Sequence, residues 1–278
     1  MRSIVAVLAA LTLCQAKPHV RLGGPGVSLV RNANPYVIGG TNASPGEFPW
    51  QLSQQRQSGS WSHSCGASLL SSTSALSASH CVDGVLPNNI RVIAGLWQQS
   101  ETSGTQTANV DSYTMHENYG AGTASYSNDI AILHLATSIS LGRNIQAAVL
   151  PANNNNDYAG TTCVISGWGR TDGTNNPPDI LQKSSIPVIT TAQCTAAMVG
   201  VGGANIWDNH ICVQDPAGNT GACNGDSGGP LNCPDGGTRV VGVTSWVVSS
   251  GLGACLPDYP SVYTRVRAYL GWIGDNSR

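Results

Sequence analysis

From Phe48 onward, short apolar runs alternate with stretches rich in Gly, Asn, Pro and Ser. Short runs bounded by turn-forming residues predict β-strands, and many such strands in succession are typical of an all-β sandwich or barrel. The clearest runs are residues 92–93, 130–135, 162–165, 186–189 and 240–243. Residues 136–160, which contain a run of four asparagines at 153–156, read as a connection between two halves.

Helical periodicity is clear only at the end of the chain. Val266, Tyr269, Leu270 and Ile273 recur at helical spacing, so we expect a helix over residues 265–275. The apolar run at 4–13 has a different character, because it follows Arg2 and ends at the small-residue sequence Cys14-Gln-Ala16. This pattern predicts a secretory signal peptide over residues 1–16.

The segment 17–36 contains prolines and glycines without apolar periodicity, which indicates an extended, poorly ordered stretch. After residue 16 the sequence contains no run long and apolar enough to cross a membrane. We therefore expect a secreted, soluble protein that makes no membrane contact.

The amino-acid composition limits the classes of binding partner that we expect. Among the 278 residues 10% are charged, and the formal net charge is −2. With no basic stripe, nucleic acid is not expected as a partner. The length allows one or two domains with a large core.

Nine cysteines occur, and Cys14 leaves with the signal peptide. The eight that remain are an even number, as expected for disulfides in an oxidising compartment, although spacing alone leaves their pairing open. Because no CxxC pair is present, we expect no zinc site and no other metal.

The strongest chemical signal is Gly221-Ala-Cys-Asn-Gly-Asp-Ser-Gly-Gly-Pro230. Its glycines allow a tight turn and close approach of a substrate to the main chain. Such a turn exposes the Ser227 hydroxyl, which needs an adjacent base to act as a nucleophile. The backbone N–H groups of Gly225 and Ser227 would point at one position, where two donors can stabilise a developing oxyanion.

Other motifs accompany this loop in a fixed order: Val37-Ile-Gly-Gly40, Ser79-His-Cys81, Asn128-Asp-Ile-Ala131, Ser166-Gly-Trp-Gly169, Ser245-Trp246 and Val262-Tyr-Thr-Arg-Val266. Together they resemble the trypsin/chymotrypsin family of serine proteases over about residues 37–275. Within that family the sequence is most similar to the earthworm fibrinolytic proteases, the lumbrokinases.

The resemblance implies a fold of two six-stranded antiparallel Greek-key barrels, with the active site between them and a C-terminal helix. The N-terminal barrel would span about residues 50–140 and the C-terminal barrel about 150–262, within a protease domain at 37–278. It also implies a catalytic triad of His80, Asp129 and Ser227. His80 would act as general base and acid, and Asp129 would orient the imidazole.

The same resemblance assigns the substrate-binding residues. The backbone at Ser245, Trp246 and Val247 would pair with an extended peptide. Gly221 lies at the floor of the specificity pocket, where trypsin-like relatives carry aspartate, and Val247 and Ser261 replace common wall glycines. We therefore expect an elastase-like preference for small or medium apolar residues before the scissile bond (P1).

Four disulfides follow from the resemblance: Cys65–Cys81, Cys163–Cys233, Cys194–Cys212 and Cys223–Cys255. Residues 17–36 would be an activation peptide, and the new amino group of Val37 would pair with Asp226. Tyr36 stands before this cut, where most relatives carry Arg or Lys. The activating protease would then be chymotrypsin-like, or a second trimming step would follow cleavage after Arg31.

These features predict a secreted serine endopeptidase, made as a precursor, without a cofactor and expected to be a monomer. Its substrates would be proteins or peptides, with fibrin and fibrinogen as candidates, in a digestive or fibrinolytic role. Two alternatives stay open: limited processing in body-fluid defence or coagulation, and an inactive binding protein on the same fold.

A sequon at Asn42, followed by Pro45, leaves glycosylation open. His63, His116, His134 and His210 receive no assigned role, and Leu96-Trp97-Gln98 lacks the acidic ligands of a calcium loop.

Overall fold

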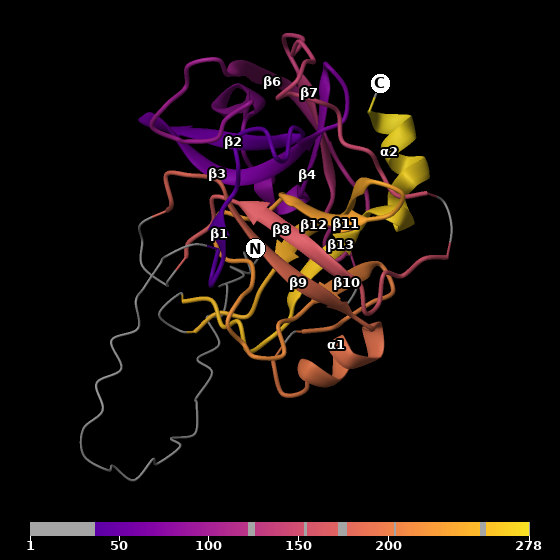
Figure 1. Cartoon of the computed structure of the whole chain (residues 1–278). Helices are drawn as coiled ribbons and strands as arrows, with labels where there is room; N and C mark the ends of the chain where they lie inside the picture. Colours follow the sequence, from indigo (N-terminus) through magenta and orange to yellow (C-terminus); the bar gives the residue numbers. More distant parts are fainter. Residues whose placement is uncertain are drawn as a thin grey trace, which may run out of the picture.

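The computed structural model describes residues 37–121, 126–152, 155–171, 177–202, 204–250 and 254–277. The expected signal peptide at 1–16 and activation peptide at 17–36 lie outside these residues, as does part of the asparagine run at 153–156. Figure 1 shows two groups of strands, one from each half of the chain, with the C-terminal helix α2 beside the N-terminal group.

The N-terminal group forms a closed antiparallel barrel in the order β2-β3-β4-β7-β6-β5. Its strands are β2 Gln51–Ser58, β3 Ser60–Leu69, β4 Ser74–Ser77, β5 Ile90–Ala94, β6 Gln106–Met115 and β7 Ala131–Leu135. Leu52, Leu69, Ile90 and Leu133 are fully buried in its interior. Inward and outward side chains alternate along a strand, except at the irregularities in β2 and β6.

The C-terminal group closes a second antiparallel ring, because β8 pairs with both β9 and β11. Its strands are β8 Thr162–Gly167, β9 Gln182–Ile189, β10 His210–Val213, β11 Pro230–Pro234, β12 Thr238–Trp246 and β13 Ser261–Arg265. The short strand β1, Thr41–Asn42, pairs with β9 outside this ring. The expectation of two six-stranded antiparallel barrels is therefore confirmed.

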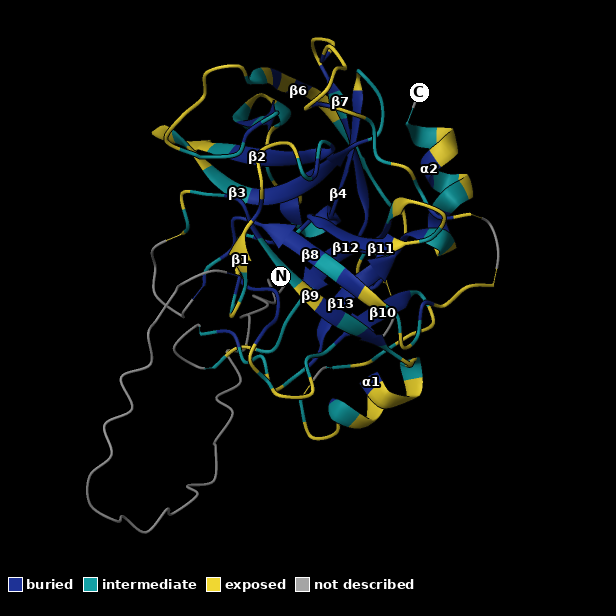
Figure 2. Ribbon diagram, viewed as in Figure 1, coloured by how far each residue is buried: buried dark blue, intermediate teal, exposed yellow. Residues whose placement is uncertain are grey.

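The two barrels meet through apolar and polar contacts. Phe48, Trp50 and Ile93 of the first half pack with Trp168 and Val240 of the second. Trp50 Nε1 donates to Asn232 Oδ1 at 2.9 Å, which satisfies both groups in a buried position. Figure 2 shows the burial concentrated on the strands, with α1 exposed along much of its length.

The C-terminal helix is also confirmed, with a tighter first turn than expected. A 3₁₀ turn at Val266–Tyr269 precedes α2 at Leu270–Asn276. Val266, Tyr269 and Ile273 pack against Leu76 and Ile132 of the first barrel. The end of the chain therefore crosses back from the second barrel to cover the first.

One helix was not predicted. α1 spans Thr191–Ala197, too short for its periodicity to stand out. Its start has a recognisable capping box: Thr190 Oγ1 accepts from Gln193 N, and Gln193 Oε1 accepts from Thr190 N. The Thr-x-x-Gln spacing was therefore the available signal in the sequence.

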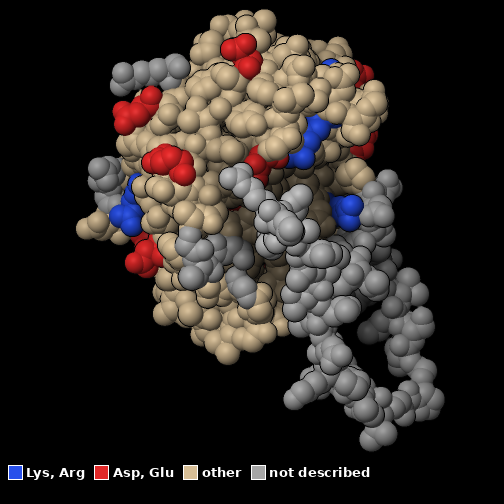
Figure 3. Space-filling model, turned by 180° about the vertical axis from the view of Figure 1, so that it is seen from behind, with Lys and Arg blue, Asp and Glu red and all other residues tan. Residues whose placement is uncertain are grey.

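The disulfides are the four pairs that the resemblance implies: Cys65–Cys81, Cys163–Cys233, Cys194–Cys212 and Cys223–Cys255. Cys65–Cys81 ties β3 to the turn that carries His80, and Cys223–Cys255 braces the loop before Ser227. Lys and Arg side chains are scattered over the face in Figure 3, as the low charge content leads one to expect.

Candidate active site

His80 and Asp129 are brought together by two neighbouring strands. His80 lies in a 3₁₀ turn, Ser79–Cys81, directly after β4, and Asp129 lies directly before β7. Because Ser77 pairs with Ala131, the two segments leave the barrel side by side. His80 Nδ1 lies 2.7 Å from Asp129 Oδ2, and the His80 backbone N donates to Asp129 Oδ1 at 3.0 Å.

The second barrel completes the surroundings of Asp129, which is fully buried. Ser245 Oγ donates to Asp129 Oδ2 at 2.6 Å, and Thr264 Oγ1 donates to the Asp129 carbonyl at 2.7 Å. Ser245 stands at an irregularity in the pairing of β12 with β13, between Thr244 and Trp246. Such a bulge redirects a side chain, here toward the carboxylate.

Ser227 is held against the first barrel by its loop. Gly66 N donates to the Ser227 carbonyl at 2.7 Å, and Gly228 N donates to the Thr244 carbonyl at 2.8 Å. A Cβ on Gly228 would stand 2.4 Å from Ser77 Oγ, and the φ of this residue is +76°. Only glycine fits there, and its absence of a side chain lets the Ser227 loop approach the base of the His80 turn.

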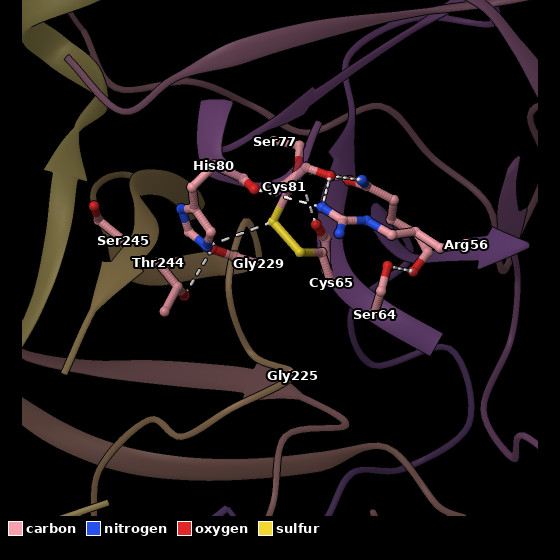
Figure 4. The surroundings of a disulfide bond; sticks show 12 residues. Arg56, Ser64, Cys65, Ser77, His80, Cys81, Gly225, Gly229, Thr244 and Ser245 are labelled. Carbon is pink, nitrogen blue, oxygen red and sulfur yellow. Dashed lines mark hydrogen bonds between the residues drawn. A yellow bond between two sulfur atoms is a disulfide. The ribbon is translucent and has the colours of Figure 1, made fainter. Parts of the chain in front are cut away.

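The hydroxyl of Ser227 makes no hydrogen bond within the residues that the structure describes. Figure 4 shows the His80 ring beside the Cys65–Cys81 disulfide, with Ser245 and Thr244 nearby. His80 Nε2 lies 3.7 Å from Cys81 Sγ. In a free enzyme the bond between nucleophile and base is often loose and tightens when substrate binds.

Backbone N–H groups in the Ser227 loop fall into two sets. Those of Cys223, Asp226, Gly228 and Gly229 donate to protein acceptors. Those of Gly225 and Ser227 have no acceptor in the described part of the chain. Gly225 has φ +103°, a conformation that side chains rarely adopt. The two free donors are the pair expected to face an oxyanion.

His63 is a site residue that the sequence analysis missed. Its Nε2 donates to the Gly225 carbonyl at 2.9 Å, and its Nδ1 accepts from Ser53 Oγ at 2.8 Å. Burial lowers the pKa of His63 to about 4, partly offset by the bond to Gly225, so the ring is neutral near pH 7. It thereby holds the peptide unit next to the proposed oxyanion donor. No local sequence signal marks this role, because the partners lie far away in the chain.

The carbonyl of Cys81 is fixed from β2, which the sequence also did not reveal. Arg56 donates to this carbonyl at 2.6 Å (Figure 4). Gln54 Nε2 donates to it at 3.0 Å. Gln54 Oε1 in turn accepts from Ser77 Oγ at 2.8 Å. The turn that carries His80 is therefore held at both of its ends.

Asp226 is buried beneath the Ser227 loop. Its carboxylate accepts from Gly169 N at 2.8 Å and Cys223 N at 2.9 Å. Burial raises its pKa to about 6, although these two backbone donors lower it. Val37 is fully buried in the core cluster that includes Ala222, the neighbour of Cys223. No cation pairs with Asp226 among the described residues.

Two of the residues expected to line the specificity pocket, Gly221 and Ser261, lie close together in the structure. A Cβ on Gly221 would lie 3.2 Å from Ser261 Oγ and 3.7 Å from Pro257 Cβ. Ser261 Oγ accepts from Ala222 N at 3.0 Å, which fixes it beside Gly221. Val247 packs against the core of the second barrel, while Trp246 lies 6.3 Å from the His210 ring.

One group of residues has the spacing of metal ligands. The ligand atoms of Cys65, His80 and Cys81 lie within 4.8 Å of one another. Both sulfurs are bonded to each other in a disulfide, so they do not fit a metal ion. Within the described residues this is the only such group of three.

Comparison with known proteins agrees with this geometry. Residues 37–273 match the trypsin family. The chain belongs to the trypsin family.

The protease is 98% identical over 242 residues to a fibrinolytic enzyme, isozyme C, of Lumbricus rubellus, covering 87% of this chain and all of the relative. It is 37% identical to a chymotrypsin-like serine proteinase of Haliotis rufescens, covering 86% of this chain and 91% of the relative. Trypsin-1 of Astacus astacus is also 37% identical, with 87% and 100% covered. The resemblance to earthworm fibrinolytic proteases is confirmed, and the chain is a serine endopeptidase that acts on proteins.

Among the described residues no helix has the length and apolar character needed to cross a membrane.

The burial of His63 predicts a pH dependence of stability. Its folded pKa of about 4 lies below the ordinary histidine pKa of 6.5, so between these values only the unfolded chain binds the proton. The free energy of unfolding contributed by His63 should therefore fall as the pH is lowered from 6.5 to about 4. His63→Gln cannot titrate and should show a shallower fall, measured by denaturant unfolding at each pH. Equal slopes for both proteins would contradict a His63 ring that stays neutral in the folded protein over this pH range.

Proposed function

We propose that the endopeptidase cleaves peptide bonds through an acyl-enzyme on Ser227, with His80 as general base and acid and Asp129 as its orienting partner. The observation that carries this proposal is the pair of N–H groups at Gly225 and Ser227 that have no acceptor among the described residues, in a loop where the N–H groups of Cys223, Asp226, Gly228 and Gly229 are bonded. Preorganised donors of this kind stabilise the charge that develops on the substrate carbonyl.

The steps follow from the donor and acceptor at each atom. His80 Nδ1–H donates to Asp129, which leaves Nε2 free to take the Ser227 proton as Oγ attacks the carbonyl carbon. The resulting oxyanion accepts from Gly225 N–H and Ser227 N–H. The protonated imidazole then gives its proton to the leaving amine, and the C–N bond breaks. Water, deprotonated by His80, then attacks the ester carbon. The C–O bond to Ser227 breaks, the acid is released, and the protonated His80 returns its proton to Ser227 Oγ.

Labelling with an organophosphonate tests this assignment. The activated enzyme should bind the label at Ser227 in close to one equivalent and lose activity, because the reagent needs both the nucleophile and the oxyanion donors. Ser227→Ala, which keeps the loop, is the matched control and should take up no label. An activated wild-type enzyme that took up none would instead support the binding-protein alternative.

We further propose an elastase-like P1 preference. Gly221 brings no charge to the pocket floor, and the Ser261 hydroxyl and Pro257 occupy the space around it. The neutral floor disfavours Lys and Arg, and Val247 is proposed to narrow the wall. Small or medium apolar side chains such as Ala, Val and Leu fit this description, with modest discrimination of about 1–3 kcal/mol per methylene.

Peptides that differ only at P1 test the pocket. We expect kcat/KM for Ala, Val or Leu to exceed that for Lys or Arg by about tenfold or more. Val247→Gly should raise kcat/KM for Phe relative to Ala. Val248→Gly is the matched control, because Val248 packs in a different core cluster. Dominance of Lys or Arg would show that the pocket assignment is wrong.

The precursor is proposed to be activated by cleavage before Val37. The trypsin-family match begins at residue 37, and the Lumbricus relative matches over its whole length of 242 residues, which equals the span from Val37 to Arg278. Burial of Asp226 without a cation is costly, and the new amino group of Val37 would compensate it. This pairing would order the loop that carries Gly225.

Replacing Tyr36 tests the activation step. Tyr36→Arg should make the precursor activatable by trypsin, with Val37 as the new N-terminus. In the wild type trypsin should cut after Arg31, which leaves Tyr36 attached and the enzyme inactive, whereas chymotrypsin should activate it. N-terminal sequencing identifies the first residue of each treated protein, and active-site titration measures the fraction of it that is active. A fully active wild-type enzyme that begins at any residue other than Val37 would contradict the proposal.

A secreted, monomeric enzyme with a digestive or fibrin-degrading role is the proposed physiological setting. The name of the Lumbricus relative supports fibrin as a substrate. Release of soluble fragments from cross-linked fibrin by the activated enzyme would support this role. A failure to release them would favour limited processing of other proteins.

A further inference from the structure

The turn that aims Asp129 depends on the residue before it. Asn128 has φ +52°, in the left-handed region that asparagine tolerates better than most residues. Ile130 N donates to the Asn128 carbonyl at 2.9 Å, so Asp129 stands at the centre of a three-residue turn. Any change in this turn would swing the Asp129 carboxylate relative to the His80 ring.

The side chain of Asn128 is anchored at both of its polar atoms. Tyr269 donates its hydroxyl to Asn128 Oδ1 at 2.9 Å, and Asn128 Nδ2 donates to the Asn118 carbonyl at 2.9 Å. The Tyr269 oxygen in turn accepts from Asn209 Nδ2 at 3.2 Å. These bonds connect the turn to two other segments of the chain, which favours one arrangement of the turn.

Tyr269 is suited to hold this arrangement. It is almost fully buried, at the end of the 3₁₀ turn Val266–Tyr269. Burial, together with the charge of Asp129, raises the pKa of the Tyr269 hydroxyl, while the bond from Asn209 lowers it. The hydroxyl therefore stays protonated and donates to Asn128.

A second contact ties the same loop to α2. Trp272 Nε1 donates to Glu117 Oε2 at 3.0 Å. The His116 ring lies 5.3 Å from the rings of both Tyr269 and Trp272, and His116 N donates to the Ile130 carbonyl at 3.1 Å. The segment on each side of Asp129 is thus attached to the C-terminal segment 266–276.

From these contacts we propose that Tyr269 is a positioning residue for catalysis, acting through Asn128 on the orientation of Asp129. The C-terminal segment then sets the alignment of the triad and does more than cover the first barrel. This inference rests on the proposed triad. The two oxygens of Asp129 are already committed to His80 and Ser245, so a small rotation of the turn weakens several short bonds together.

Tyr269→Phe tests the role of the hydroxyl, because it keeps the ring and its packing. We expect kcat to fall about tenfold, with KM changed by less than about twofold, since the loss falls on the chemical step. The rate of phosphonate labelling should fall by a similar factor, while the titrated fraction of sites stays the same. Tyr113→Phe is the matched control, because the Tyr113 hydroxyl donates to the Val85 carbonyl at 2.9 Å in the first barrel and makes no contact with the proposed triad through that bond.

A double-mutant cycle shows whether Tyr269 acts through Asn128. Asn128→Gly keeps the left-handed backbone accessible and removes the side chain that Tyr269 binds. The double variant should lose little more kcat than the more impaired single variant. Additive losses, or a Tyr269→Phe enzyme with normal kcat and only lowered stability, would overturn the inference. Absence of phosphonate labelling in the wild type would instead refute the proposed function, so the two failures are distinguishable.

Discussion

The buried carboxylate of Asp129 is the group on which the rest of the site depends. An ionised carboxylate removed from water is costly unless hydrogen bonds replace its hydration. Here the replacement comes from two barrels: His80 donates from the first, and Ser245 donates from the second. Neither barrel could hold this charge alone, so the catalytic geometry and the docking of the barrels stabilise each other.

Asp226, the second buried carboxylate, is arranged differently. It has two backbone donors and a pKa raised to about 6 by burial, so its ionised form is less favoured than that of an ordinary aspartate until a cation arrives. This difference suits a group proposed to receive a new amino terminus. The hydrogen-bond donors to the Asp129 carboxylate are all in place in the folded chain. Asp226 instead lies beneath a loop whose order would depend on the proposed cleavage before Val37.

Much of this arrangement could be predicted from the sequence. The glycine-rich loop at Ser227 carries its own backbone requirement, as the steric limit at Gly228 shows. The roles of His63 and Arg56 could not be predicted, because the carbonyls of Gly225 and Cys81 that they bind lie far away in the chain. The same is true of Tyr269, which the periodicity identified only as one apolar position of the C-terminal helix. α1 was missed for a different reason: it depends on a cap and a disulfide more than on an amphipathic pattern.

The chemistry of these supporting residues has a further consequence. With only 10% charged residues, the chain builds its site from neutral donors and acceptors, such as Ser245, Thr264, Asn128 and Gln54. Hydroxyls and amides do not titrate between acidic and mildly alkaline pH, so these bonds keep their geometry while an imidazole gains and loses its proton. Salt screens ion pairs at the surface but has little effect on buried neutral bonds. The alignment of Asp129 should therefore depend on packing and backbone conformation far more than on solution conditions. The pH dependence of the site is expected to come from histidines such as His63, whose pKa is lowered by desolvation.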